Sequence, residues 1–244
     1  MAGRIVEELA EALGALAAFV WAGPCAACGD DLPRGAVAGV CPRCWELLPA
    51  REGPGCARCD LPWPRPLDPA SCPDCAGVRD DPLDRIVAAF VYVGPLVPLH
   101  RRLKFHGAAE LAPPLARRMA AAYRARSGDA DLVVPVAPDP LRLAARRATP
   151  RRLARAVARE LGLPLDLRAL RKTRHTKPLT GRGAEARRAA LDGAFRARAA
   201  HVAGRVPLLI DDVATTGATL RAAAAALRLA GARRVEALVL ARTP

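Results

Sequence analysis

The sequence predicts an α/β protein with a parallel sheet, preceded by a cysteine-rich segment. Three observations support this fold class. Beyond about residue 84, short apolar runs alternate with helical stretches rich in Ala and Leu, a pattern typical of a parallel sheet covered by helices. Before that point, four Cys-x-x-Cys pairs fall in a stretch rich in Pro and Gly. Near the C-terminus, an apolar run ends in two adjacent carboxylates and a Thr/Gly loop.

The length and composition bound what the chain can be. Its 244 residues suffice for one or two domains. We expect an N-terminal helix and cysteine module over residues 1–80 and an α/β domain over residues 81–244. The net charge of +14 favours nucleic acid or phosphorylated ligands. An Arg-rich, Lys-poor chain also follows from GC-rich coding, so charge alone does not identify a partner.

The N-terminal segment is predicted to be an amphipathic helix rather than a signal peptide. Ile5, Leu9 and Leu13 recur at helical spacing. Glu7 and Glu8 stand where a signal peptide is positively charged. No apolar stretch is long enough to span a bilayer. We therefore expect a cytoplasmic protein without membrane insertion.

The cysteines form an internal repeat with ligand spacing suited to tetrahedral Zn²⁺. The eight are Cys25, Cys28, Cys41, Cys44, Cys56, Cys59, Cys72 and Cys75. Disulfides are the alternative, but a reducing compartment disfavours them. Sequential pairing of the motifs would give two ribbons and interleaved pairing a cross-brace, and the spacing allows both. Every ligand position of the repeat holds a cysteine, so no coordination position is left open and we expect the zinc to be structural. We also expect the segment to need zinc in order to fold, because it is poor in apolar periodicity.

The elements of the second part follow from its apolar runs. Strands are predicted over residues 86–93, 132–136, 165–170, 206–210 and 235–240. Helices are predicted over residues 96–126, with breaks at Gly107 and at Pro113-Pro114, and over residues 151–161 and 217–230. A polar stretch covers residues 171–185.

The segment over residues 208–220 predicts a sugar-phosphate site. Asp211 and Asp212 end the strand, and their carboxylates can accept hydrogen bonds from vicinal ribose hydroxyls. The loop and helix start that follow offer backbone N–H groups, Thr hydroxyls and the positive end of a helix to a phosphate. These residues are Ala214, Thr215, Thr216, Gly217, Ala218 and Thr219. The alternative is an ordinary strand-to-helix turn capped by Thr.

The polar stretch contains a basic cluster with two interpretations. It is either a solvated crossing or a lid of cations that closes over a diphosphate. Its members are Arg171, Lys172, Arg174, His175 and Lys177. The remaining histidines, His100, His106 and His201, are scattered without metal or triad spacing, so no catalytic role is predicted for them.

These motifs together resemble the ComF/GntX family, and the resemblance covers nearly the whole chain. Its strongest anchors are the cysteine pairs and the segment over residues 211–219. The matching shorter segments are Tyr92-x-Gly94, Leu103-Lys104-Phe105-x-Gly107, Val134-Pro135-Val136 and Gly193-Ala194-Phe195. The resemblance implies a parallel-sheet type I phosphoribosyltransferase-like domain with an N-terminal zinc-binding module.

By this resemblance, the chain would bind 5-phosphoribosyl 1-diphosphate. Asp211 and Asp212 would hold the ribose hydroxyls and the loop over residues 214–219 the 5′-phosphate. The turn at Pro135, Val136 and Ala137 would meet the pyrophosphate, and Mg²⁺ would arrive with it. Thr215 stands where purine-salvage relatives have Asp, so no carboxylate acting on a purine base is expected. We expect affinity for the diphosphate; if the chain is an enzyme, it would be a phosphoribosyltransferase, and the pentosyl transfer would displace pyrophosphate from C1.

The resemblance also implies a link to DNA uptake during natural transformation. Single-stranded DNA and DNA-uptake proteins would then be partners, and Trp45 and Trp63 are the candidate stacking residues. The alternative hypothesis is a zinc-dependent protein that binds single-stranded nucleic acid, with a ribosyl diphosphate pocket that is vestigial or serves as a sensor.

Overall fold

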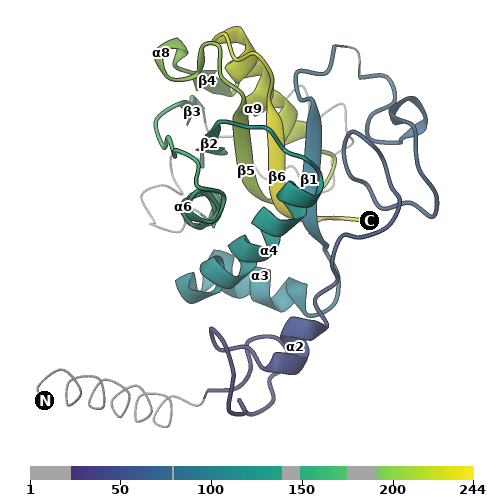
Figure 1. Ribbon diagram of the computed structural model, residues 1–244, viewed down its shortest axis with the longest axis vertical. Coiled ribbons are helices and arrows are strands. Elements are labelled where there is room, and N and C mark those ends of the chain that lie inside the picture. The colour runs from purple at the N-terminus through teal and green to yellow at the C-terminus, as the bar shows by residue number, and fades with distance from the viewer. Residues whose placement is uncertain (1–22, 79, 139–148, 175–190, 192) are drawn as a thin grey trace, which may run out of the picture.

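The protein is an α/β fold built on a four-stranded parallel sheet with strand order β1-β6-β5-β2 (Figure 1). The computed structural model describes residues 23–78, 80–138, 149–174, 191 and 193–244. The predicted N-terminal helix therefore lies outside the described residues. The strands are β1 (Arg85–Val91), β2 (Leu132–Pro135), β5 (Pro207–Ala214) and β6 (Glu236–Arg242).

The central strands are apolar because both of their faces are covered. All seven residues of β6 and the first four of β5 are buried, as expected for a parallel sheet between helices. The strand β5 is longer than the predicted residues 206–210, because its pairing with β6 continues to Ala214 opposite Arg242. Both aspartates, Asp211 and Asp212, therefore lie within the strand rather than after it.

The main sheet divides the core into two hydrophobic clusters, one on each face. One contains residues of α4 (Ala112–Ala125) and α6 (Thr149–Leu161), and the other contains residues of α9 (Ala218–Leu229) (Figure 1). The helix α3 (Leu96–Phe105) packs in the first cluster and ends before Gly107, where a break was predicted. A 3₁₀ turn, η2 (Ala109–Leu111), leads into α4.

The prediction of a second helix break at Pro113-Pro114 was wrong. These prolines lie in the first turn of α4, where the missing N–H groups have no intrahelical partner to lose. They begin the helix instead of interrupting it.

A small antiparallel sheet lies beside α9. It pairs β3 (Leu170–Lys172) with β4 (Phe195–Ala197), and α8 (Ala199–Val202) follows. The predicted strand over residues 165–170 thus begins later than expected. Leu165 makes an isolated parallel bridge with Val133 of β2 instead.

The cysteine-rich segment contains the short helix α2 (Pro42–Glu46), the 3₁₀ turn η1 (Pro69–Ser71) and connecting turns. Its middle part, around residues 49–60, lies along the outer edge of β1 (Figure 1). The amide of Arg51 donates to the carbonyl of Ala89 at 2.8 Å, and the amide of Ile86 donates to the carbonyl of Arg58 at 2.7 Å. The segment is therefore hydrogen-bonded to the sheet rather than merely tethered to it.

A buried carboxylate strengthens this junction. Asp60 pairs with Arg51 and with Arg126, each at 3.1 Å, and accepts the amide of Ala88 at 2.9 Å. Burial raises the pKa of Asp60 even though these partners oppose the shift. None of the helices within the described ranges has the length and apolar character needed to cross a bilayer.

Candidate functional site

The connection from β5 to α9 forms a tight loop that depends on Gly217. This residue has a φ of 73°, in the left-handed region that favours glycine. A Cβ at this position would also lie 3.1 Å from Nη1 of Arg221 and 3.3 Å from Cδ1 of Ile86. The sequence therefore needs glycine here both for the backbone conformation and for space.

A cavity of about 240 Å³ lies over this loop. Its lining residues are Leu191, Asp211, Val213, Ala214, Thr215, Thr216, Gly217, Ala218, Thr219 and Leu220. The structure thus brings together every residue predicted for the ribose hydroxyls and the 5′-phosphate except Asp212. The N-terminus of α9 also meets this cavity, which suits an anion.

The structure separates the two adjacent carboxylates. Successive side chains of a strand point to opposite faces, and Asp212 points toward α3 rather than into the cavity. Its Oδ2 accepts a hydrogen bond from Nε2 of His100 at 3.0 Å and pairs with Nζ of Lys104 at 2.6 Å. The hydroxyl of Tyr92 lies 3.0 Å from Nδ1 of the same histidine.

This arrangement drives the pKa values of the two carboxyls apart. Burial and the charge of Asp212 raise the pKa of Asp211. Burial also acts to raise the pKa of Asp212, but the hydrogen bond from His100 and the charge of Lys104 outweigh it and hold that pKa well below its ordinary range. The pair therefore keeps one firm negative charge, on Asp212, and one carboxyl facing the cavity that retains its proton to higher pH.

The candidate pyrophosphate residues lie at the same edge of the sheet. Pro135 ends β2 opposite Ile210, and the amide of Val136 donates to the carbonyl of Ile210 at 2.9 Å. Both Val136 and Ala137 are buried, and neither lines the 240 Å³ cavity. The residues that follow, 139–148, lie outside the described part of the chain.

Only part of the candidate lid is described, and that part is not a loop. Arg171 and Lys172 belong to β3, paired with Arg196 and Phe195 of β4. The Lys172 ammonium lies 5.9 Å from the ring centroid of Phe195. Arg174 follows β3, and His175 and Lys177 lie outside the described residues. The polar stretch thus begins as a strand, contrary to the expectation of an irregular crossing from residue 171.

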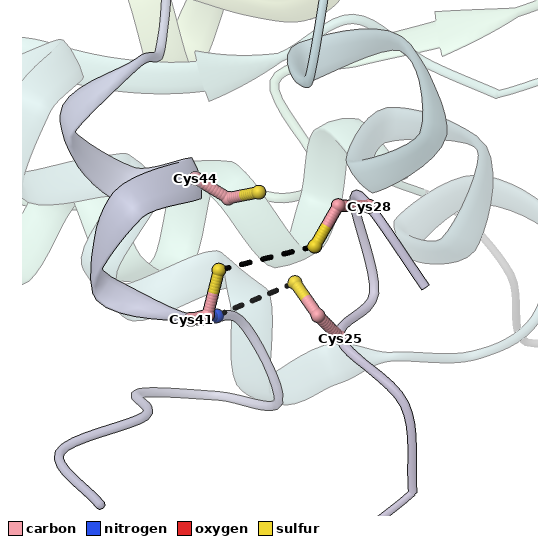
Figure 2. A group of neighbouring side chains, drawn as sticks. All are labelled: Cys25, Cys28, Cys41 and Cys44. Carbon is pink, nitrogen blue, oxygen red and sulfur yellow. Dashed lines mark hydrogen bonds between the residues drawn. The ribbon is translucent and has the colours of Figure 1, made fainter. Parts of the chain in front are cut away.

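The eight cysteines form two clusters by sequential pairing. The first cysteine cluster is Cys25, Cys28, Cys41 and Cys44, and the second is Cys56, Cys59, Cys72 and Cys75. Within each cluster all sulfur atoms lie within 4.8 Å of one another. Figure 2 shows the four side chains of the first cluster converging, two from the turn of Cys25 and Cys28 and two from the start of α2. All eight are free cysteines, so the disulfide alternative is not realised in the structure.

The geometry of both clusters fits zinc. A tetrahedron with Zn–S bonds of about 2.3 Å places its sulfurs about 3.8 Å apart. The Sγ atoms of Cys28 and Cys41 lie 4.0 Å apart, and those of Cys59 and Cys72 lie 3.6 Å apart. Four thiolates would hold each ion with no open coordination position, so its contribution would be structural. The first cluster packs among residues of α3 and α4 and the second in the cluster of α9.

The two tryptophans proposed to stack bases differ in availability. Trp63 is 41% exposed, on the surface of the cysteine-rich segment. Trp45 is half-buried, and its Nε1 donates to the carbonyl of Val37 at 3.0 Å. Trp63 is therefore the better placed to contact a nucleic acid.

Several residues of the site had no predicted role. In the sequence, Lys104 and Tyr92 stand only within the segments that resemble the family, and the spacing of His100 from the other histidines predicts no role for it. Arg221 and Arg242, described below, contact both the loop and the second cluster. The spacing of His100 and Lys104, four apart, does indicate one helical face, but only the fold shows that this face meets Asp212.

Comparisons with known proteins agree with this architecture. Residues 149–244 match the model of the phosphoribosyl transferase domain. The chain is 30% identical to the DNA utilization protein YhgH of Salmonella typhimurium over 211 residues, covering 84% of this chain and 91% of the relative. The protein of the same name from Escherichia coli K12 is 31% identical over 194 residues, covering 77% and 84%.

Two solved structures are similar over a smaller part of the chain. One is an allosteric regulatory enzyme of purine biosynthesis, with 20% identity and a TM-score of 0.39. The other is the glutamine phosphoribosylpyrophosphate amidotransferase of B. subtilis, with 20% identity and a TM-score of 0.40. Each comparison covers 57% of this chain and 30% of the solved chain.

The two DNA utilization proteins match this chain at 30% and 31% identity over most of both chains. The phosphoribosyl transferase match and the paired cysteine clusters agree with them. The chain therefore belongs to the ComF/GntX family.

Proposed function

We propose that the protein binds 5-phosphoribosyl 1-diphosphate in the cavity between β5 and α9. Asp211 accepts hydrogen bonds from ribose hydroxyls, and the loop over residues 214–219 receives the 5′-phosphate. The observation that carries the proposal is that one cavity joins a carboxylate to a phosphate-type loop at a helix N-terminus. Asp212 stabilises the site without contacting the ligand, because its contacts with His100 and Lys104 hold the end of β5 against α3.

Mg²⁺ fits this proposal as an ion that arrives with the ligand. Among the described cavity residues, Asp211 is the one carboxylate, too few for a resident magnesium site made by the protein alone. Bound to the diphosphate, Mg²⁺ would supply positive charge at the leaving group. Transfer of the ribosyl group would displace pyrophosphate from C1, with the protein positioning the reactants.

The proposal extends to the whole chain. Residues 1–80 form the zinc-binding module and residues 81–244 the phosphoribosyltransferase-like domain. A cytoplasmic location suits them, because a reducing compartment keeps cysteines available for zinc.

A role in handling single-stranded DNA is the second candidate function. It is favoured by relatives named DNA utilization protein, by the net charge of +14 and by the exposed Trp63. The two functions are compatible, because Trp63 and the β5–α9 cavity are separate features.

Calorimetric titration tests the first proposal. Ribosyl diphosphate with Mg²⁺ is added to zinc-loaded protein, and ribose 5-phosphate and pyrophosphate are titrated separately. We expect saturable binding of the diphosphate that is lost in Asp211→Asn and weaker binding of each fragment. Absence of binding to the unaltered protein would refute the proposal. Release of pyrophosphate on adding candidate acceptors would then report on transfer.

A further inference from the structure

Two buried arginines connect the second cysteine cluster to the loop over residues 214–219. Arg221 lies in the first turn of α9 and is 8% exposed, and Arg242 ends β6 and is 1% exposed. Each donates hydrogen bonds both to a cysteine sulfur and to a backbone carbonyl of the loop. The cluster and the cavity are thus linked by direct contacts.

Arg221 forms the first connection. Its Nη2 donates to Sγ of Cys75 at 3.4 Å, and its Nη1 donates to the carbonyl of Thr216 at 2.7 Å. Its Nε donates to Asp81 at 2.9 Å, which fixes the guanidinium plane. Because the guanidinium is rigid and planar, the positions of Cys75 and the Thr216 carbonyl are coupled.

Arg242 forms the second connection, from the neighbouring strand. Its Nη2 lies 3.9 Å from Sγ of Cys59, and its Nε donates to the carbonyl of Cys59 at 3.1 Å. Its Nη1 donates to the carbonyl of Ala214 at 3.2 Å. Asp74, between Cys72 and Cys75 in the sequence, pairs with the same guanidinium. Arg242 therefore contacts both halves of the second cluster and the start of the loop.

These contacts orient the amides that a phosphate would meet. In a trans peptide the N–H points opposite to the C=O of the same plane. The carbonyls of Ala214 and Thr216 face the arginines, so the amides of Thr215 and Gly217 point the other way. Both of these residues line the cavity. Four thiolates on one zinc would form a negatively charged group, which would hold the two guanidinium groups in place.

We propose that zinc in the second cysteine cluster sets the affinity of the loop for its phosphate ligand, with Arg221 and Arg242 as positioning residues. Loss of this zinc releases the arginine contacts, and the loop amides lose their fixed direction. The inference rests on the proposed ribosyl diphosphate site. Linkage requires the reciprocal effect, so the bound ligand retains zinc in the second cluster.

The zinc affinity of the unaltered protein tests the reciprocal effect without any substitution. A colorimetric chelator competes for zinc at equilibrium, with and without ribosyl diphosphate and Mg²⁺. We expect the ligand to tighten the binding of one of the two zinc ions about fivefold or more. Asp211→Asn with the same reagents controls for zinc bound by the diphosphate itself. Equal zinc affinities in protein that demonstrably binds the ligand would overturn the inference.

Arginine variants test the connection directly. Arg221→Gln is compared with Arg228→Gln, a change on the same helix at a residue that bonds Pro82 and Asp84 instead. We expect Arg221→Gln to weaken ligand binding about tenfold, the loss of a charged hydrogen bond. Amide hydrogen exchange over residues 214–219 should rise in the same variant. Arg228→Gln should change neither quantity.

Hydrogen exchange separates this inference from the proposed function. If the unaltered protein fails to bind ribosyl diphosphate, the proposed function fails. In that case, faster exchange over residues 214–219 after zinc removal and in Arg221→Gln would still support coupling of the second cluster to the loop. Unchanged exchange in both samples would overturn it.

Discussion

Replacing Asp212 with Asn tests the separation of the two carboxylates most directly. The change keeps the shape of the side chain but removes the charge that Lys104 and His100 face in a mostly buried setting. A hydrogen bond to a charged group contributes about 1.5–3 kcal/mol. Asn retains one neutral acceptor, and Lys104 is 30% exposed, so water offsets part of the loss. We expect Asp212→Asn to lower the free energy of unfolding by about 2–3 kcal/mol.

Chemical and thermal denaturation measure this effect. For a chain of this size the loss corresponds to a fall in Tm of roughly 5–10 °C. The pKa of Asp212 is depressed, so its stabilisation is present above the ordinary carboxyl pKa of about 3.9 and is lost as the pH falls through the folded value. The difference between Asp212→Asn and the unaltered protein should therefore be full at neutral pH and shrink in acid.

Asp211→Asn is the matched control, with the same change one residue earlier. The pKa of Asp211 is raised, so the stability it contributes is present below about pH 3.9 and is lost as the pH rises. Removing this ionisable group should leave stability unchanged or higher at neutral pH while abolishing ribosyl diphosphate binding. Equal destabilisation by the two variants, or none by Asp212→Asn, would refute the division of roles.

Three further outcomes follow from the structure. Gly217→Ala should destabilise the protein by about 1–2 kcal/mol and weaken ligand binding, because Ala would have to adopt a left-handed φ and its Cβ would press on Arg221. Unfolding curves measure the first effect and calorimetry the second. Metal analysis should find two zinc ions per chain, and chelation should lower Tm; a metal-free protein of unchanged Tm would contradict a structural role. Affinity for single-stranded DNA should fall steeply with salt and drop several-fold in Trp63→Ala, measured by fluorescence anisotropy, whereas salt-independent binding would exclude phosphate contacts.

The sequence predicted the sheet and the location of the cavity because both depend on local patterns. Apolar runs mark the four strands of the main sheet, and the loop over residues 214–219 carries its own conformational requirements. The predicted strand over residues 206–210 ends four residues before β5 does, because Asp211 and Asp212 break the apolar run. In the folded protein, pairing with β6 continues through both aspartates, so the strand alternation sends them to opposite faces.

The contacts that complete the site depend on the tertiary fold. His100 lies 112 residues from Asp212, and Arg221 lies 146 residues from Cys75. No periodicity links such pairs, and the chain contains so many arginines that the sequence does not indicate which of them contact the site. Sequential and interleaved pairing of the cysteines satisfied the same spacing, so the choice between them also needed the fold.

The hydrogen bonds between the cysteine-rich segment and β1 have a consequence for attempts to produce the phosphoribosyltransferase-like domain alone. β1 is an outer strand of the sheet, and Arg51, Arg58 and Asp60 satisfy backbone groups along its free side. A truncation that begins at residue 81 would leave these groups open to pairing with another molecule. Such a fragment should aggregate by pairing at this edge. The cysteine-rich segment therefore also keeps the protein soluble by covering the edge strand.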